Sequence, residues 1–302
     1  MRIGMVMNLP YPHPILSPVV AVDGGGTTCR IACVSAQGRC VVEVGPANVS
    51  SDYDGALGRL RDGIAELASH VTGGAEALYG APAYLGLAGV ASPRIAARVA
   101  ADLPFQVVRV EDDRHPALAG AHGDADGAIA HCGTGSFLAL QAGEARRFAG
   151  GWGPVLGDEA SAQWIGRRAL AVALNAHDGL AEQSDLTRRL LADYDGTGGI
   201  VAFAAEAPPH ELGQIARRVT AAAQAGDVAG QGLMREGAAY LWQALGAMGW
   251  TPQMALCLTG GIGPLYAPYL PPEAQAAIVA PKGAPIEGAI ALAYALQKEQ
   301  TQ

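Results

Sequence analysis

Hydrophobic residues in the first third of the chain fall into two spacings. Leu57, Leu60, Ile64 and Leu67 recur every three or four positions, which predicts an amphipathic helix over about 54–70. Short apolar runs bounded by glycine or polar residues predict strands at 19–22, 29–35, 39–44, 84–87 and 106–110. With a further helix expected over 93–103, this part of the chain is predicted to be α/β.

The same order of elements begins again near residue 127. Predicted strands at 127–131, 137–141 and 145–148 surround the turn Gly133–Ser136, as the first three strands surround Gly24–Thr28. Helical patterns then follow at 161–176, 184–193, 211–225 and 227–248, with a strand at 254–258 and a closing helix at 288–296. The repeat predicts two similar βββαβα domains that face one another.

These patterns also suggest domain boundaries. We expect a loose leader over 1–17, because this apolar stretch is broken by three prolines. The N-terminal domain is expected over 18–116, with the C-terminal helix at 288–300 as a candidate to complete it. The C-terminal domain, with a helical insertion, is expected over 117–287.

Composition narrows the classes of protein. The 302 residues carry a net charge of −8, which disfavours nucleic-acid and anionic-membrane partners. No stretch of eighteen apolar residues occurs, and the five cysteines include no CxxC pair. We therefore expect a soluble cytoplasmic protein without disulfides or structural zinc.

The two glycine-rich turns are candidate phosphate sites. Glycine lets backbone N–H groups approach an anion, and Thr or Ser hydroxyls add donors. The residues concerned are Gly24, Gly25, Gly26, Thr27, Thr28, Gly133, Thr134, Gly135 and Ser136. Asp23 would be repelled by phosphate unless Mg²⁺ lay between them, directly or through water. Plain hairpins, with Asp23 capping the first, are the alternative.

Asp113 is the candidate catalytic base. It follows an apolar strand, where a carboxylate could orient an acceptor hydroxyl and take its proton. Asp113 could also be the N-cap of a helix around Pro116, and both interpretations could hold together. Glu111 and Asp112 adjoin it, and side-chain alternation would place Asp112 on the other face.

Two further glycine-rich segments suggest ligands. In Gly150–Glu159, Trp152 could lie against a sugar ring while Asp158 bonds its hydroxyls; alternatively Trp152 is core and Asp158 caps the next helix. Gly260–Gly263 could hold adenine and ribose. The histidines show no metal-ligand spacing, so a satisfied or exposed histidine is favoured over a ligand for each. His131, beside the second phosphate turn, is the one most open to a functional role.

Taken in order, these segments resemble the BadF/BadG/BcrA/BcrD ATPase family of the actin-like superfamily, and within it the bacterial glucosamine and N-acetylglucosamine kinases. The matching segments are DGGGTTCR (23–30), GPAN (45–48), GLAG (86–89), VEDD (110–113), GTGS (133–136), GGWGPVLGDEAS (150–161), GGIG (260–263) and IEGAIALA (286–293). Together they span nearly all of the chain from Pro18 to Leu296.

The resemblance implies an actin-like (ribonuclease H-like) fold around an ATP and sugar cleft, and a homodimer. It implies that ATP and Mg²⁺ are bound at Asp23–Thr28, Gly133–Gly135 and Gly260–Gly261, with Asp113 as the base for the sugar 6-hydroxyl. Amino-sugar contacts would fall on Asn48, Gly151, Trp152 and Asp158. Thr28 stands where many members carry Lys, and Asp112 where they usually carry Asn.

Two other functions compete with the amino-sugar kinase. A dehydratase-activating ATPase would share a [4Fe–4S] cluster through cysteines, and a brown, oxygen-sensitive protein would favour it. A nucleotide-gated binding protein would hydrolyse ATP without any dependence on sugar. The first alternative assigns no role to Gly150–Glu159, and for the second the chain lacks the added polymerisation or peptide-binding segments that such proteins need.

Overall fold

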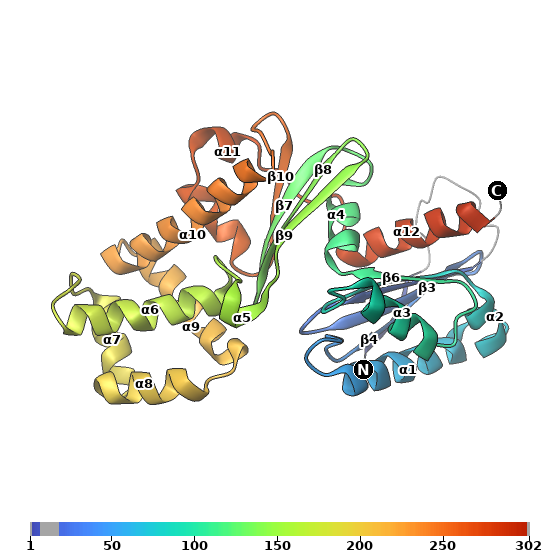
Figure 1. Cartoon of the computed structure of the whole chain (residues 1–302), viewed down its shortest axis with the longest axis horizontal. Helices are drawn as coiled ribbons and strands as arrows, with labels where there is room; N and C mark the ends of the chain where they lie inside the picture. Colours follow the sequence, from blue (N-terminus) through green and yellow to red (C-terminus); the bar gives the residue numbers. More distant parts are fainter. Residues whose placement is uncertain (1, 7–17, 301–302) are drawn as a thin grey trace. The chain divides into compact units, whose positions relative to one another are not determined.

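The computed structural model describes residues 2–6 and 18–300, and its backbone divides into two compact units (Figure 1). The first unit comprises the chain up to Asp124 together with the residues from Pro281 onward. The second unit comprises Ala125–Ala280.

A six-stranded mixed sheet forms the centre of the first unit, in the order β1-β4-β3-β2-β5-β6. β2, β3 and β4 are joined by tight turns and pair antiparallel, whereas β5 and β6 continue the sheet in parallel with β2. The strands are β1 (Arg2–Val6), β2 (Val19–Gly24), β3 (Cys29–Ser35), β4 (Gly38–Val44), β5 (Ala83–Leu87) and β6 (Val108–Asp112).

Helices cover both faces of this sheet (Figure 1). Val20, Val22 and Leu85 face a core shared with the amphipathic α1 (Tyr53–His70) and with Val99 of α3 (Pro93–Asp102). The other face packs on α12 (Pro285–Gln300) and α4 (Arg114–His122). The short α2 (Gly74–Gly80) leads into β5.

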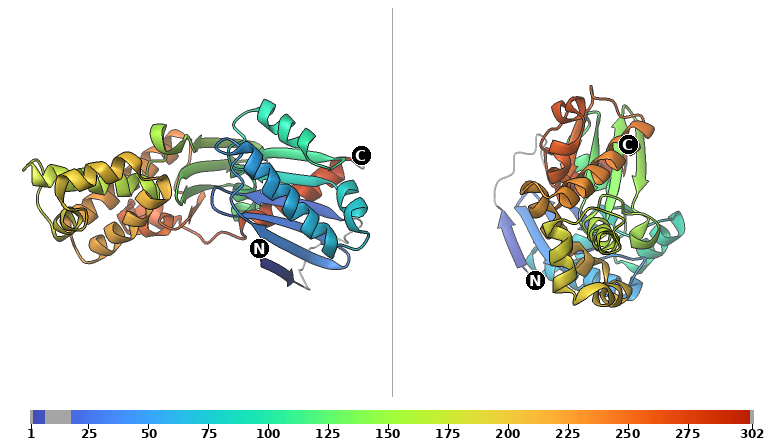
Figure 2. Two further views of the ribbon diagram at one scale, coloured as in Figure 1. Left: turned by 90° about the horizontal axis from the view of Figure 1, so that it is seen from below. Right: turned by 90° about the vertical axis from the view of Figure 1, so that its left-hand side faces the viewer.

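The second unit repeats this plan in reduced form (Figure 2). Its sheet has the order β10-β7-β8-β9, with β7, β8 and β9 antiparallel and β10 parallel to β7. A parallel bridge from Leu256 to Ile278 stands where a fifth strand would be. The strands are β7 (Gly127–Cys132), β8 (Ser136–Ala142), β9 (Ala145–Gly150) and β10 (Ala255–Thr259). The predicted duplicated α/β fold is confirmed.

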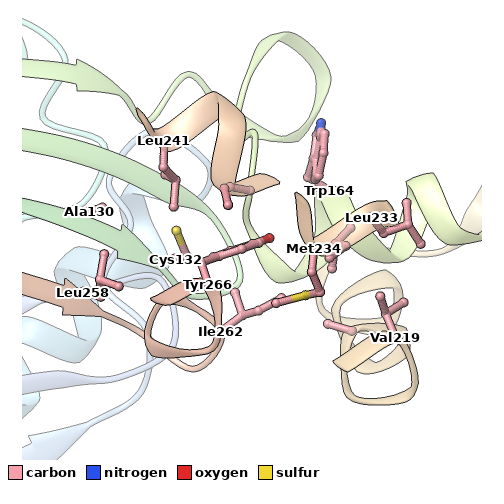
Figure 3. Packing of buried hydrophobic residues seen from close by; sticks show 14 of the residues in the cluster. Ala130, Cys132, Trp164, Val219, Leu233, Met234, Leu241, Leu258, Ile262 and Tyr266 are labelled. Atoms are coloured by element: carbon pink, nitrogen blue, oxygen red, sulfur yellow. The ribbon is translucent and has the colours of Figure 1, made fainter. Parts of the chain in front are cut away.

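The second unit carries most of the helices. Figure 3 shows part of its core, where Cys132 at the end of β7 lies near Ile262 and Tyr266, with Met234 of α10 beside them. The helices are α5 (Gly153–Leu156), α6 (Ala162–His177), α7 (Asp185–Asp193), α8 (Gly196–Glu206), α9 (Pro209–Gln224), α10 (Val228–Ala247), the 3₁₀ segment η1 (Gly263–Tyr269) and α11 (Pro272–Ala276).

Three features differ from expectation. Arg2–Val6 is an edge strand paired with β4 and not part of a loose leader; residues 7–17 lie outside the described part. The first unit extends to Asp124 rather than 116, and resumes at Pro281 rather than 288. The reason is that α4 packs directly on α12: a Cβ at Gly288 would lie 2.0 Å from the carbonyl oxygen of Pro116.

Candidate active site

The carboxyl edge of the first sheet gathers the acidic residues. Asp23, Gly86 and Glu111 are paired across β2, β5 and β6, so their side-chain positions share one face. The ring of Pro116 occupies the space beside Gly86, where a Cβ would lie 2.3 Å from the nearest ring carbon. Asp113 follows directly after β6 and opens α4. The fold therefore places Asp23 and Asp113 at one edge, as the topology of parallel strands requires.

Burial and mutual repulsion shift the pKa of Asp113. Its carboxyl is half-buried, and its pKa is raised to about 7, chiefly by desolvation. The negative charges of Asp112 and Asp23 contribute to this rise, whereas Arg114 opposes it. Asp113 takes the N-cap position of α4 but its side chain makes no capping hydrogen bond. Asp113 therefore holds the expected helix-cap position, but capping does not engage its carboxylate.

Asp23 lies in a similar environment. Its pKa is raised to about 6, because desolvation outweighs the opposing effect of the Arg30 guanidinium. Arg30 is the cross-strand partner of Asp23, and its Nε donates to Glu43 at 3.1 Å. The pairing of Asp23 with Arg30 escaped sequence analysis, although equal spacing from the Gly25–Thr28 turn could have indicated it.

The first glycine hairpin is tightly packed where it leaves the sheet and solvent-exposed at its tip. Gly25 N–H donates to the Thr28 carbonyl at 3.0 Å, and a side chain at Gly24 would strike Leu87. A Cβ at Gly26 would meet nothing within 4 Å, and Gly26, Thr27 and Thr28 are exposed. Exposed amides and hydroxyls on a rigid hairpin fit a phosphate group.

Asn48 lies in the loop beside this hairpin. Its Oδ1 accepts from the N–H and hydroxyl of Ser50 and from Ser51 N–H, at 2.9–3.3 Å. The same loop packs on Gly89, which has φ +86° and leaves no room for a Cβ. With its oxygen so engaged, Asn48 can offer a ligand the two N–H donors of its amide.

In the second unit, hydrogen bonds join the turn Gly133–Ser136 to the start of α6. Gly133 and Thr134 carbonyls accept from the N–H groups of Ala162 and Gln163, at the start of α6. The Ser136 hydroxyl donates to the Glu159 carbonyl at 2.6 Å, so it is not the phosphate donor considered above. Thr134 is exposed, so its hydroxyl remains a candidate phosphate donor.

The turn at Gly260 packs against the backbone of Cys132 and Gly133, at the start of the Gly133–Ser136 turn. Gly260 has φ +80°, and a Cβ there would lie 2.3 Å from the Cys132 carbonyl oxygen. Gly261, by contrast, is exposed and faces open space. His131 Nδ1 lies 3.0 Å from Thr259 Oγ1, and burial lowers its pKa to about 4, so the ring is neutral. The second unit thus brings Gly133–Gly135 and Gly260–Gly261 together, and His131 is the satisfied histidine expected.

The Gly150–Glu159 segment has one exposed and one buried part. Trp152 is 70% exposed, so it is not core; Val155 and Leu156 beside it are each 83% exposed. Asp158 is only 7% exposed, and its carboxylate accepts from Ser136 N–H. The cap of α6 is Ser161, whose side chain accepts from Trp164 N–H. Both structural alternatives for Trp152 and Asp158 are therefore wrong.

The Asp158 carboxylate also organises the turn around it. Burial raises its pKa, while the N–H groups of Ser136 and Gly153 lower it. Asp158 itself has the left-handed backbone conformation, at φ 60°. A side chain at Gly135 would come within 2.9 Å of Asp158 Oδ2. Gly151, which precedes Trp152, is exposed with φ +75°.

Metal-ligand clusters and membrane spans are both absent from the part of the chain that the structure describes. No three or more His, Cys, Asp or Glu side chains gather there as an ion site. All five cysteines are buried free thiols. None of the helices described is both long and apolar enough to cross a bilayer.

Comparison with known proteins gives a consistent picture. The family model of the BadF/BadG/BcrA/BcrD ATPases matches residues 20–293. Glucosamine kinase GspK of Vibrio cholerae is 30% identical over 278 residues, which cover 91% of this chain and 95% of that protein. An N-acetylmuramic acid/N-acetylglucosamine kinase of Clostridium acetobutylicum is 24% identical over 76% of this chain and 78% of its own length.

A solved structure extends the likeness to the fold. The crystal structure of a candidate N-acetylglucosamine kinase from Chromobacterium violaceum superposes with a TM-score of 0.78 and 30% identity. The match covers 93% of this chain and 100% of that one.

Proposed function

Because this chain belongs to the BadF/BadG/BcrA/BcrD ATPase family, we propose that it is an ATP-dependent kinase of an amino sugar, glucosamine or N-acetylglucosamine. The observation that carries the proposal is Asp113: a half-buried carboxylate with a pKa of about 7 and no capping bond, at the carboxyl edge of a parallel sheet. The named activities of the relatives supply the acceptor class.

Asp113 is suited to act as a general base. A base works best when its pKa lies near the working pH, since it is then often deprotonated and still binds a proton well. In the proposed reaction Asp113 accepts a hydrogen bond from the sugar 6-hydroxyl. As the bond from oxygen-6 to the γ-phosphorus forms and the bond to the ADP oxygen breaks, the hydroxyl proton passes to Asp113.

The glycine turns would hold the nucleotide. The open tips of Gly24–Thr28 and Gly133–Gly135 offer amides and threonine hydroxyls to phosphate, and Gly260–Gly261 offers a bare backbone to the adenosine. Asp23 would hold Mg²⁺, directly or through water, and a carboxylate oxygen is a ligand this ion prefers. When bound, the ion supplies positive charge to the transferring phosphoryl group.

The sugar would be held by groups of both donor and acceptor type. Asn48 offers amide N–H groups, and the second Asp158 oxygen can accept from a hydroxyl. The exposed ring of Trp152, next to Gly151, can cover an apolar sugar face. The two candidate substrates differ only in the amine, which is free in glucosamine and acetylated in N-acetylglucosamine.

The test of this proposal is ADP release coupled to NADH oxidation across a panel of hexoses and amino sugars. We expect turnover with glucosamine or N-acetylglucosamine and little with glucose. Asp113→Asn keeps the shape but loses the base, and should lower kcat by about 10²–10⁴-fold with the fold intact. ATP turnover independent of every sugar, or a near-normal kcat in Asp113→Asn, would contradict it.

The dehydratase-activating alternative finds no support in the cysteines. Cys29, Cys33 and Cys40 are buried in the first three-stranded part of the sheet, and Cys132 and Cys257 in the second unit. A shared cluster needs exposed thiolates, whereas burial raises the pKa of the Cys33 thiol to about 12. The homodimer and the cytoplasmic location remain predictions.

A further inference from the structure

The residue before the proposed base, Asp112, accepts hydrogen bonds from the start of α4. An aspartate at an N-cap ordinarily accepts an N–H group from the second or third residue of the helix, and the third residue of α4 is Pro116, which has no N–H. Asp113 holds this position in α4, at φ −63° and ψ −13°, without such a bond. Asp112 Oδ1 instead accepts from Arg114 N–H at 2.9 Å and from Arg114 Nε at 2.6 Å.

This local structure is well defined. The side chains of Arg114 and Asp112 are only 21% and 19% exposed. One oxygen of Asp112 thus accepts two hydrogen bonds from Arg114, one from its backbone N–H and one from its guanidinium, and these bonds span residue 113. A double contact at this burial restricts both side chains more than an exposed ion pair would.

We propose that Asp112 is a positioning residue, which engages the first N–H and the guanidinium of α4 so that the Asp113 carboxylate stays available to the acceptor hydroxyl. The inference rests on the proposed function, because it is the kinase reaction that gives Asp113 a substrate. In this role Asp112 acts through Asp113 and needs no contact with sugar or nucleotide.

The physical reason is that both carboxylates lie near one charged donor, the Arg114 guanidinium. Asp112 accepts from its Nε, and its charge also acts on the neighbouring Asp113 carboxylate. If Asp112 no longer accepted from Arg114, the guanidinium could turn to Asp113 instead. A carboxylate drawn toward Arg114 is displaced from the hydroxyl, and displacements of about 1 Å can cost 10²-fold in rate.

Two substitutions separate this role from a charge effect. Asp112→Asn keeps an oxygen where Oδ1 lies and can accept both hydrogen bonds, although it removes the negative charge. Asp112→Ala removes the acceptor. Kinetics are to be measured at pH 8.5, above the pKa of about 7 of Asp113, so that the base is deprotonated throughout.

We expect Asp112→Ala to lower kcat by about tenfold or more, with the KM for ATP within about twofold, at a temperature where urea titration shows both proteins fully folded. Asp112→Asn should restore kcat to within about threefold of the wild type. Equal kcat in Asp112→Ala and the wild type would overturn the inference. So would an Asp112→Asn variant as slow as Asp112→Ala, since the charge and not the hydrogen bonds would then matter.

A double variant guards against a purely structural effect. If Asp112 acts only through Asp113, Asp112→Ala/Asp113→Asn should be no slower than Asp113→Asn alone. An additive loss would overturn the positioning role. The two proposals also fail separately: a near-normal Asp113→Asn refutes the base, whereas a slow Asp113→Asn beside a normal Asp112→Ala refutes only the role of Asp112.

Discussion

At the residue scale, the proposed chemistry depends on the Asp113 carboxyl. Desolvation, Asp112 and Asp23 all favour its protonated form, and only Arg114 and a backbone hydrogen bond oppose them. A carboxylate of ordinary pKa would be a weak base for an alcohol, because it would hold the accepted proton poorly. The same burial that makes Asp113 costly to ionise therefore suits it to this step.

This shift predicts the pH dependence of the enzyme. As the proposed base, Asp113 must be deprotonated to act, and its pKa is raised to about 7, so we expect activity to be lost as the pH falls through 7. Below that value, kcat/KM for the sugar should fall about tenfold per pH unit. Measurement between pH 5.5 and 9 tests this; a rate constant unchanged down to pH 5.5 would show that the base has an ordinary pKa.

At the scale of elements, the position of Asp113 depends on the packing of α4 against α12. Gly120 and Gly288 allow the two helices to meet backbone to backbone, and Lys282 Nζ bonds the His122 carbonyl at the end of α4. Gly86 makes room for Pro116 at the other side. A helix held at both ends and along one face gives its first residue a fixed place.

Gly288→Ala tests this support. The added Cβ would lie 2.0 Å from the Pro116 carbonyl oxygen, so α4 must move. We expect a loss of about 1–3 kcal/mol in the free energy of unfolding, and a lower kcat. Gly232→Ala is the matched control, since this helical glycine in α10 has nothing within 4 Å and should gain up to about 1 kcal/mol. Equal urea midpoints for the two variants would contradict the packing argument.

The Gly260 turn gives a second element test. Gly260→Ala would introduce both a left-handed alanine and a contact of 2.3 Å with the Cys132 carbonyl. The free energy of unfolding should fall by about 1–3 kcal/mol, and calorimetry should show weaker ATP binding. Gly261→Ala, which faces open space, should leave stability unchanged. If both variants were equally stable, the turn would not need its glycine.

Sequence patterns predicted helices and strands well where the hydrophobic periodicity was strong, and poorly where glycines interrupted that periodicity. The amphipathic pattern predicted α1, and the apolar runs predicted the first hairpins. In α8, Gly196, Gly198 and Gly199 are typical of a loop, yet they lie within a helix. Asp112 belongs to the end of β6, two residues beyond the predicted strand, because the ladder with β5 continues to Leu87.

At the scale of the molecule, the duplication was predictable and the unit boundaries were not. Two strand–turn–strand openings are visible in the sequence, and they become β2–β4 and β7–β9. The assignment of α4 to the first unit depends on contacts between residues near 116–120 and 284–288, which no local pattern reveals. The site followed the same rule: residue types were visible, whereas hydrogen bonds such as Ser136 to Glu159 and Asp112 to Arg114 were not.

The duplication also accounts for how the proposed roles are divided between the two units. Each unit carries a glycine turn after its first hairpin strand, at Gly24–Thr28 and Gly133–Ser136. The first unit adds carboxylates at the ends of β2 and β6, and the second adds Asp158 and the Gly260 turn. Proposed base and proposed metal ligand therefore belong to one unit, which a single sheet holds in register.

The central claim is transfer of a phosphoryl group to the 6-hydroxyl of an amino sugar with Asp113 as base. Phosphorus–proton correlation NMR of the product formed from ATP with glucosamine, and separately with N-acetylglucosamine, tests it most directly. We predict a phosphomonoester coupled to the two protons on carbon 6 for at least one sugar, and almost none with Asp113→Asn. Phosphorus coupled to the proton on carbon 1, or only inorganic phosphate, would contradict the claim.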